Sequence, residues 1–175
     1  MTTGRLYAVT VVGRDRPGIV AGITRTLYEA GCNLEDVTST ILRGHFSMVM
    51  IVSAPAGRSR EDLASVLEET AAALGVSVSL NPVTDAHGEV VPPTHIVSVH
   101  GADKPGIVYR VASALAARGA NITDLTSRVL GSDEDPVYAV MLEVALTEGA
   151  ETDLRTLADE LDVHVSVNRL ETDVL

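Results

Sequence analysis

Two stretches of the chain, 88 residues apart, combine a carboxylate with a glycine-containing turn of the kind that opens a helix. The first reads Gly-Arg-Asp-Arg-Pro-Gly-Ile-Val from Gly13, and the second reads Gly-Ala-Asp-Lys-Pro-Gly-Ile-Val from Gly101. The first N–H groups of a helix have no acceptor within it and carry a partial positive charge, so they attract carboxylates and phosphates. The expected donors are the N–H groups of Gly18, Ile19, Gly106 and Ile107.

Side chains beside these donors complement an amine. Asp15 and Asp103 stand two residues before the proline and can accept hydrogen bonds from an ammonium group. Asn33 and Asn121 open the next expected strand, which we expect to place them near the same end of the sheet. Donors for a carboxylate beside an acceptor for an amine predict a receptor for a free amino acid.

Two other interpretations of these stretches stay open. A phosphate would meet the basic Arg14, Arg16 and Lys104, but Asp15 would repel it. Asp-x-Pro-Gly ahead of a helix is also typical of plain capping, in which the aspartate accepts hydrogen bonds from backbone N–H groups and no ligand is involved. Asn33 would then merely follow the turn at Gly31.

An internal repeat sets the organisation of the chain. When residues 6–40 are placed over residues 94–128, 14 of the 35 positions are identical. This period exceeds the roughly 20–50 residues of solenoid repeats, so it indicates a duplicated domain. We expect a first domain over residues 1–82, a linker with two prolines over 83–93, and a second domain over 94–175.

Each copy has the same expected order of elements. A short strand (6–12 and 94–100) precedes a helix that starts at Pro17 or Pro105, because proline suits the first helical position. Gly31 and Gly119 then supply a left-handed cap. A hairpin (33–42 with 46–52, and 121–130 with 137–144), a second helix and a closing strand (76–80 and 163–167) follow. The order βαββαβ predicts two ferredoxin-like α+β domains in tandem.

The composition excludes several classes of function. The net charge is −11, which provides no electrostatic footprint for a phosphate backbone, so we expect no direct binding of nucleic acid. Residues 1–82 have 7 basic and 8 acidic residues, whereas residues 94–175 have 6 and 14, so the second copy carries most of the charge. No apolar run is long enough for a membrane span. One cysteine, Cys32, and no recognisable signal segment favour the cytoplasm.

The repeated segment Asp-Arg-Pro-Gly-Ile-Val, followed by Gly-Cys-Asn-Leu-Glu-Asp, resembles the opening of an ACT domain, a small regulatory module that binds amino acids. Two copies resemble the tandem ACT-domain regulators, the family of the glycine cleavage system transcriptional repressor. In the similar serine-binding ACT domain of phosphoglycerate dehydrogenase, two asparagines used by the site fall at Asp15 and Asn33 here, and at Asp103 and Asn121. A histidine used by that site falls at Gly13 and Gly101.

We therefore expect a non-catalytic regulator, a homodimer that senses a small amino acid and controls a protein partner. The resemblance implies that this partner is a transcriptional regulator of amino-acid metabolism. The alternatives are a ligand-independent interaction module and a detached regulatory piece of an amino-acid or nitrogen-metabolism enzyme. No nucleophile–base pair, metal-ligand spacing or cofactor fingerprint is present in the sequence, so we expect no catalytic residues, metal or cofactor. Cys32 is expected to be a small filler of the core.

Overall fold

A computed structural model describes residues 5–83, 91–132 and 135–170 of the chain. The chain divides into two compact units, Met1–His87 and Gly88–Leu175. The first unit contains β1 (Arg5–Arg14), α1 (Ile19–Glu29), β2 (Asn33–Leu42), β3 (His45–Ala54), α2 (Arg60–Leu74) and β4 (Val76–Pro82). The second contains β5 (His95–Ala102), α3 (Ile107–Ala117), β6 (Asn121–Ser132), β7 (Asp135–Ala145), α4 (Ala150–Leu161) and β8 (Val163–Arg169). Most of the expected linker lies outside the described residues, so the predicted domain boundaries stay a prediction.

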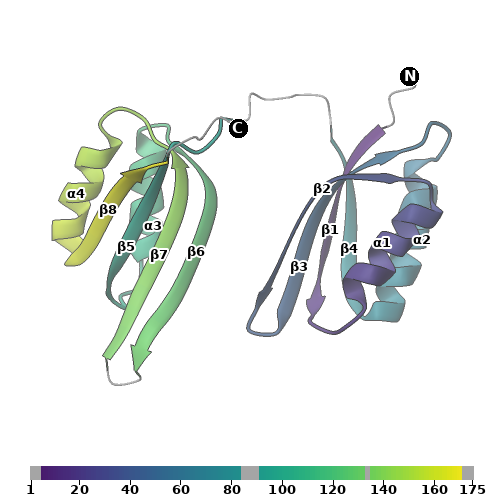
Figure 1. Cartoon of the computed structure of the whole chain (residues 1–175), viewed down its shortest axis with the longest axis horizontal. Coiled ribbons are helices and arrows are strands. Elements are labelled where there is room, and N and C mark those ends of the chain that lie inside the picture. The colour runs from purple at the N-terminus through teal and green to yellow at the C-terminus, as the bar shows by residue number, and fades with distance from the viewer. Residues whose placement is uncertain (1–4, 84–90, 133–134, 171–175) are drawn as a thin grey trace. The chain divides into compact units, whose positions relative to one another are not determined.

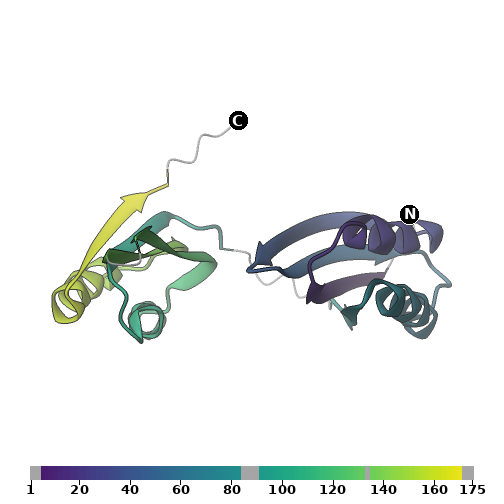
Figure 2. The same ribbon diagram turned by 90° about the horizontal axis from the view of Figure 1, so that it is seen from below.

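Each unit is a four-stranded antiparallel sheet with its two helices on one face (Figures 1 and 2). The strand orders are β2-β3-β1-β4 and β6-β7-β5-β8. The predicted βαββαβ order is therefore confirmed in both copies, and the first strand of each copy is central in its sheet. Among the described residues, no helix is long and apolar enough to cross a membrane.

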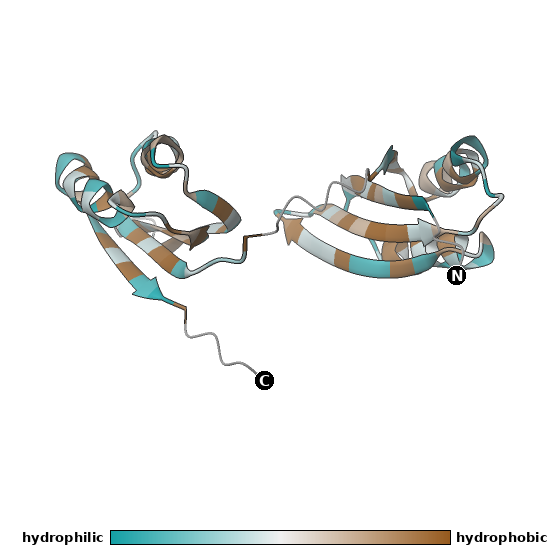
Figure 3. Ribbon diagram, turned by 90° about the horizontal axis from the view of Figure 1, so that it is seen from above, coloured by the Kyte–Doolittle hydropathy of each residue, from teal (hydrophilic) through white to brown (hydrophobic). Residues whose placement is uncertain are grey.

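The helices bury one face of each sheet. Along β3, the predicted alternation of Phe46, Met48, Met50 and Val52 is confirmed, since all four side chains are at most 5% exposed. The same alternation is visible as coloured bands along the strands (Figure 3). Leucines of the second helix of each unit, such as Leu63, complete two separate aliphatic cores, and burying such a side chain contributes about 1.5–3 kcal/mol.

The starts of the first helices differ from the prediction. Gly18 has φ 95° and Gly106 has φ 93°, a left-handed conformation that cannot belong to a right-handed helix. Each glycine is therefore the residue before the helix, and Pro17 and Pro105 precede it instead of opening the helix. The predicted left-handed glycines at the other end are confirmed.

The strand β2 lies at the edge of its sheet, beyond the cover of the helices. All ten of its residues are exposed. Because β2 and β1 are both antiparallel to β3, they run in the same direction. Leu34, Val37 and Ile41 share the helix-facing side with the buried residues of β3, yet each is more than 40% exposed. The first unit thus leaves an apolar strip uncovered along this edge.

Candidate functional site

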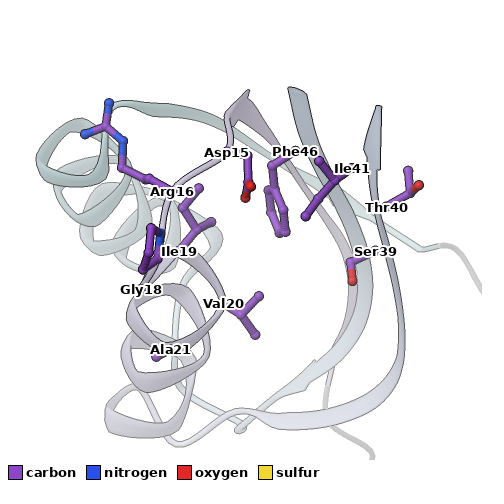
Figure 4. Close-up of a pocket in the computed structure, with 11 residues that line it drawn as sticks. Asp15, Arg16, Gly18, Ile19, Val20, Ala21, Ser39, Thr40, Ile41 and Phe46 are labelled. Carbon is purple, nitrogen blue, oxygen red and sulfur yellow. The ribbon is translucent and has the colours of Figure 1, made fainter. Parts of the chain in front are cut away.

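A groove in the first unit lies between the start of α1 and the helix-facing side of β2 (Figure 4). Its volume is about 620 Å³. The residues that line it come from the β1–α1 loop, the first turn of α1, the end of β2 and the start of β3: Asp15, Arg16, Pro17, Gly18, Ile19, Val20, Ala21, Ser39, Thr40, Ile41 and Phe46. Three of the predicted site residues, Asp15, Gly18 and Ile19, therefore meet in one concavity.

The N-terminal end of α1 has free donors at this groove. The first hydrogen bond along the helix runs from the Gly22 N–H to the Gly18 carbonyl at 2.8 Å, which leaves the N–H groups of Ile19, Val20 and Ala21 without an acceptor in the helix. No side chain among the described residues caps this end. The interpretation in which Asp15 caps the helix is therefore wrong, because the left-handed Gly18 occupies the capping position and has no side chain. The second unit repeats the arrangement at Gly106, with no side-chain cap and an Arg110 N–H to Gly106 carbonyl distance of 2.9 Å.

The carboxylate of Asp15 has no partner among the residues that the structure describes. Its backbone N–H donates to the Gly44 carbonyl at 2.8 Å, which fixes the loop against the β2–β3 turn. Its side chain makes no hydrogen bond or ion pair within the part of the chain that the structure describes, and it points into the space between α1 and Phe46 (Figure 4). Asp103 is likewise unpaired among the described residues.

The basic side chains of the two loops lie at the C-terminal ends of the second helices. Lys104 Nζ donates to the Leu161 carbonyl at 3.0 Å and lies 3.4 Å from Asp162 Oδ2, at the C-terminal end of α4. The Arg16 guanidinium lies against Gly75 at the end of α2, directed away from the groove (Figure 4). Both cations sit at a helix terminus that carries partial negative charge. Asp15 is thus the charged side chain that the groove lining directs inward, which disfavours a phosphate.

Asn33 does not join this groove within one unit. The strand pairing places Asn33 opposite Ser53, at the end of the sheet where β1 begins, whereas Asp15 follows the end of β1. The ten residues of β2 separate the two ends by roughly 30 Å. The expectation that both lie near one end of the sheet is wrong, because α1 carries the chain back before β2 starts. The same holds for Asn121, which pairs with Ala145.

Asn33 instead belongs to a small cluster around Glu35. Ser53 Oγ donates to Glu35 Oε1 at 2.6 Å, and Asn33 Nδ2 donates to the same oxygen at 2.9 Å. These two donors, Ser53 first, hold the pKa of the Glu35 carboxyl below its ordinary value.

Replacing Ser53 by alanine should raise the pKa of Glu35 toward its ordinary value, because the stronger of the two donors is lost. Since the folded-state pKa is the lower one, the cluster stabilises the fold above the pKa of the unfolded chain, and this stabilisation is lost as pH falls through the folded pKa. Carboxyl carbon chemical shifts followed by NMR from pH 2 to 7 measure the change. Ser47→Ala on the same strand is the control, and an equal Glu35 pKa in both variants would contradict the assignment.

Gly13 explains a departure from the serine-binding pattern. A Cβ at this position would lie 2.7 Å from Val76 Cγ1 and 3.0 Å from the Val76 Cα. The equivalent Gly101 is similarly close to Val163. Strand β4 and its counterpart β8 thus pack too closely for the histidine that the resembling site carries there.

The floor of the groove was missed by the sequence reasoning. Val20, Ser39 and Ile41 point toward it, and Phe46 is buried below them (Figure 4). The signal was available, because every second residue of β2 faces the helices. To apply this alternation to the groove, it was also necessary to know that β2 extends beyond the helices.

Cys32 is half-buried against the first core. Burial raises the pKa of its thiol, which keeps it protonated and unreactive near neutral pH. This environment supports its prediction as a filler.

Comparisons with known proteins match both halves of the chain. ACT domain models match residues 6–81 and residues 95–162. The chain is 27% identical over 175 residues to the glycine cleavage system transcriptional repressor of Escherichia coli, covering 96% of this chain and 92% of that protein. A UPF0237 protein of Methanopyrus kandleri is 48% identical over 75 residues, 40% of this chain and 79% of the relative. The crystal structure of an unknown protein from Galdieria sulphuraria superposes with a TM-score of 0.82 at 25% identity, covering 95% of this chain and 99% of the other.

Proposed function

We propose that the chain binds a free amino acid in the groove beside α1 and controls a protein partner. The chain belongs to the ACT domain family and has two ACT domains in tandem, which supports a regulatory role. One observation carries the proposal. The carboxylate of Asp15, which has no partner among the described residues, lies at the same groove as the free N–H groups at the start of α1.

The groove complements both ends of an amino acid. The N–H groups of Ile19 and Val20 would bind the α-carboxylate, and Asp15 would accept from the ammonium group. Charge-assisted hydrogen bonds contribute about 1.5–3 kcal/mol each, which suits affinities in the micromolar to millimolar range of a metabolite sensor. The apolar surface of Val20, Ile41 and Phe46 favours a ligand with a small or aliphatic side chain.

A homodimer would complete the site. The edge strand β2 has free backbone groups and an uncovered apolar strip, both of which favour pairing with β2 of a second copy. Antiparallel pairing of two such strands brings residue 33 of one chain near residue 42 of the other. Asn33 of the second copy would then approach the β2–β3 turn that holds Asp15. This arrangement gives the predicted pair, Asp15 and Asn33, a way to act on one ligand.

The regulated partner is proposed to be a protein. The Escherichia coli relative is a transcriptional repressor. With a net charge of −11, direct repression by DNA contact is electrostatically disfavoured. We therefore infer that regulation of transcription would pass through a partner that itself contacts the DNA.

A thermal-shift panel of the proteinogenic amino acids tests the proposal on the full chain. At least one amino acid at millimolar concentration should raise the unfolding midpoint, because a ligand that binds only the folded state stabilises it. Capture of a protein partner should change with that amino acid. A panel without any shift, together with partner capture that ignores amino acids, would favour the interaction module instead.

A further inference from the structure

The open face of the second sheet carries two histidines side by side. His100 on β5 and His164 on the edge strand β8 are directly opposite each other in the strand pairing. Their ring centroids are 4.6 Å apart, with 46° between the ring planes. Both side chains are exposed, and neither takes part in the proposed amino-acid site. The sequence analysis predicted no metal site, because no histidine has the spacing of a known metal-binding motif.

The separation of the rings suits one shared metal ion. Nitrogen–metal bonds of about 2.0 Å at a right angle hold two imidazole ring centres about 4.5 Å apart. Imidazole ligands suit Ni²⁺, Cu²⁺ and Zn²⁺, and right-angled coordination is typical of the first two. We propose that His100 and His164 form a two-histidine site for a divalent transition metal ion.

The surroundings favour a cation. The histidines line a hollow of about 410 Å³ together with Asp159 and Asp162. One of these carboxylates, Asp162, lies 3.4 Å from Lys104 Nζ, which also donates to the Leu161 carbonyl. No group of three or more histidine, cysteine or acidic side chains is arranged for a metal among the residues that the structure describes, so water fills the remaining coordination positions. The site is therefore an open one, of modest affinity.

The first unit provides an internal comparison. Gly13 pairs with Val76 there as Gly101 pairs with Val163, so Val12 and Ser77 occupy the positions of the two histidines. At these two positions the first unit thus has no histidine. This makes the proposed site a property of the second unit alone.

Calorimetric titration of the tag-free full chain with NiCl₂ tests the site. We expect about one equivalent to bind, with affinity reduced at least 10-fold in His100→Asn and in His164→Asn, because one of the two anchoring nitrogens is lost. His45→Asn, in the first unit, is the matched control and should bind as the wild type does. Since the ion joins β8 to β5, NiCl₂ should also raise the unfolding midpoint of the wild type but not of the two variants.

Transplanting the pair tests sufficiency. The double substitution Val12→His with Ser77→His should add a second equivalent of Ni²⁺, because the two positions match in register. A dissociation constant of about 1 mM marks the weakest binding of interest. The proposal would therefore be overturned if the wild type did not bind Ni²⁺ at about 1 mM NiCl₂. Binding that persists in both asparagine variants would overturn it as well.

Discussion

Replacing Asp15 by asparagine should weaken binding of the stabilising amino acid by about 10- to 100-fold, the equivalent of one charge-assisted hydrogen bond. The substitution keeps the size of the side chain and removes its charge, so the ammonium group of the ligand loses its counter-ion. Because the Asp15 side chain has no partner among the described residues, the unfolding midpoint without ligand should stay unchanged. Calorimetric titration of the wild type and the variant measures the difference.

Two further variants sharpen this test. Glu69→Gln removes the same charge from the exposed side of α2 and should leave affinity unaltered. Asp103→Asn reports on the second unit, where the loop and its free helix N-terminus recur. Equal affinities for wild type and Asp15→Asn would show that the carboxylate does not contact the ligand.

Introducing a charge on the edge strand should separate the proposed homodimer. Val37 lies near the middle of β2, on the helix-facing side, and is 47% exposed. In an antiparallel pair of β2 strands, Val37→Lys would place two ammonium groups near each other and remove two apolar contacts of about 1.5 kcal/mol each. We expect the dimer dissociation constant to rise about 100-fold, measured by sedimentation equilibrium.

Val49→Lys is the matched control for this variant. Val49 is 41% exposed, but it lies on β3 and on the sheet face away from the helices. Its substitution should leave the dimer intact. A wild-type chain that sediments as a monomer, or dissociation by both lysine variants alike, would contradict pairing through β2.

Local patterns were sufficient to predict the elements. The repeat identified the duplication, period-two alternation identified β3, and Gly31 and Gly119 marked the helix ends. The helix starts were misplaced because Gly18 and Gly106 are left-handed, and proline chemistry alone does not reveal the conformation of the next residue. A βαββαβ order also does not state how far the edge strand extends beyond the helices.

The sequence predicted the part of the site whose residues are close together in the chain. It did not predict the part whose residues are brought together by the fold. Asp15, Gly18 and Ile19 are within five residues of one another, so their spacing alone brought them together. The position of Asn33 relative to the groove depends on the direction of β2. The positions of Phe46 and Ile41 depend on the register of the β2–β3 hairpin. The side chains of Arg16 and Lys104 point toward the C-terminal ends of α2 and α4. No motif near the loops predicts where these helix ends lie.

The most direct measurement of the central claim is a crystal structure of the full chain grown with a mixture of the proteinogenic amino acids at millimolar concentration. The account predicts density for one amino acid in the groove of the first unit. Its carboxylate should meet the N–H groups of Ile19 and Val20, and its ammonium group should meet Asp15. A groove that stays empty, with Asp15 and the start of α1 contacting only water, would contradict the account.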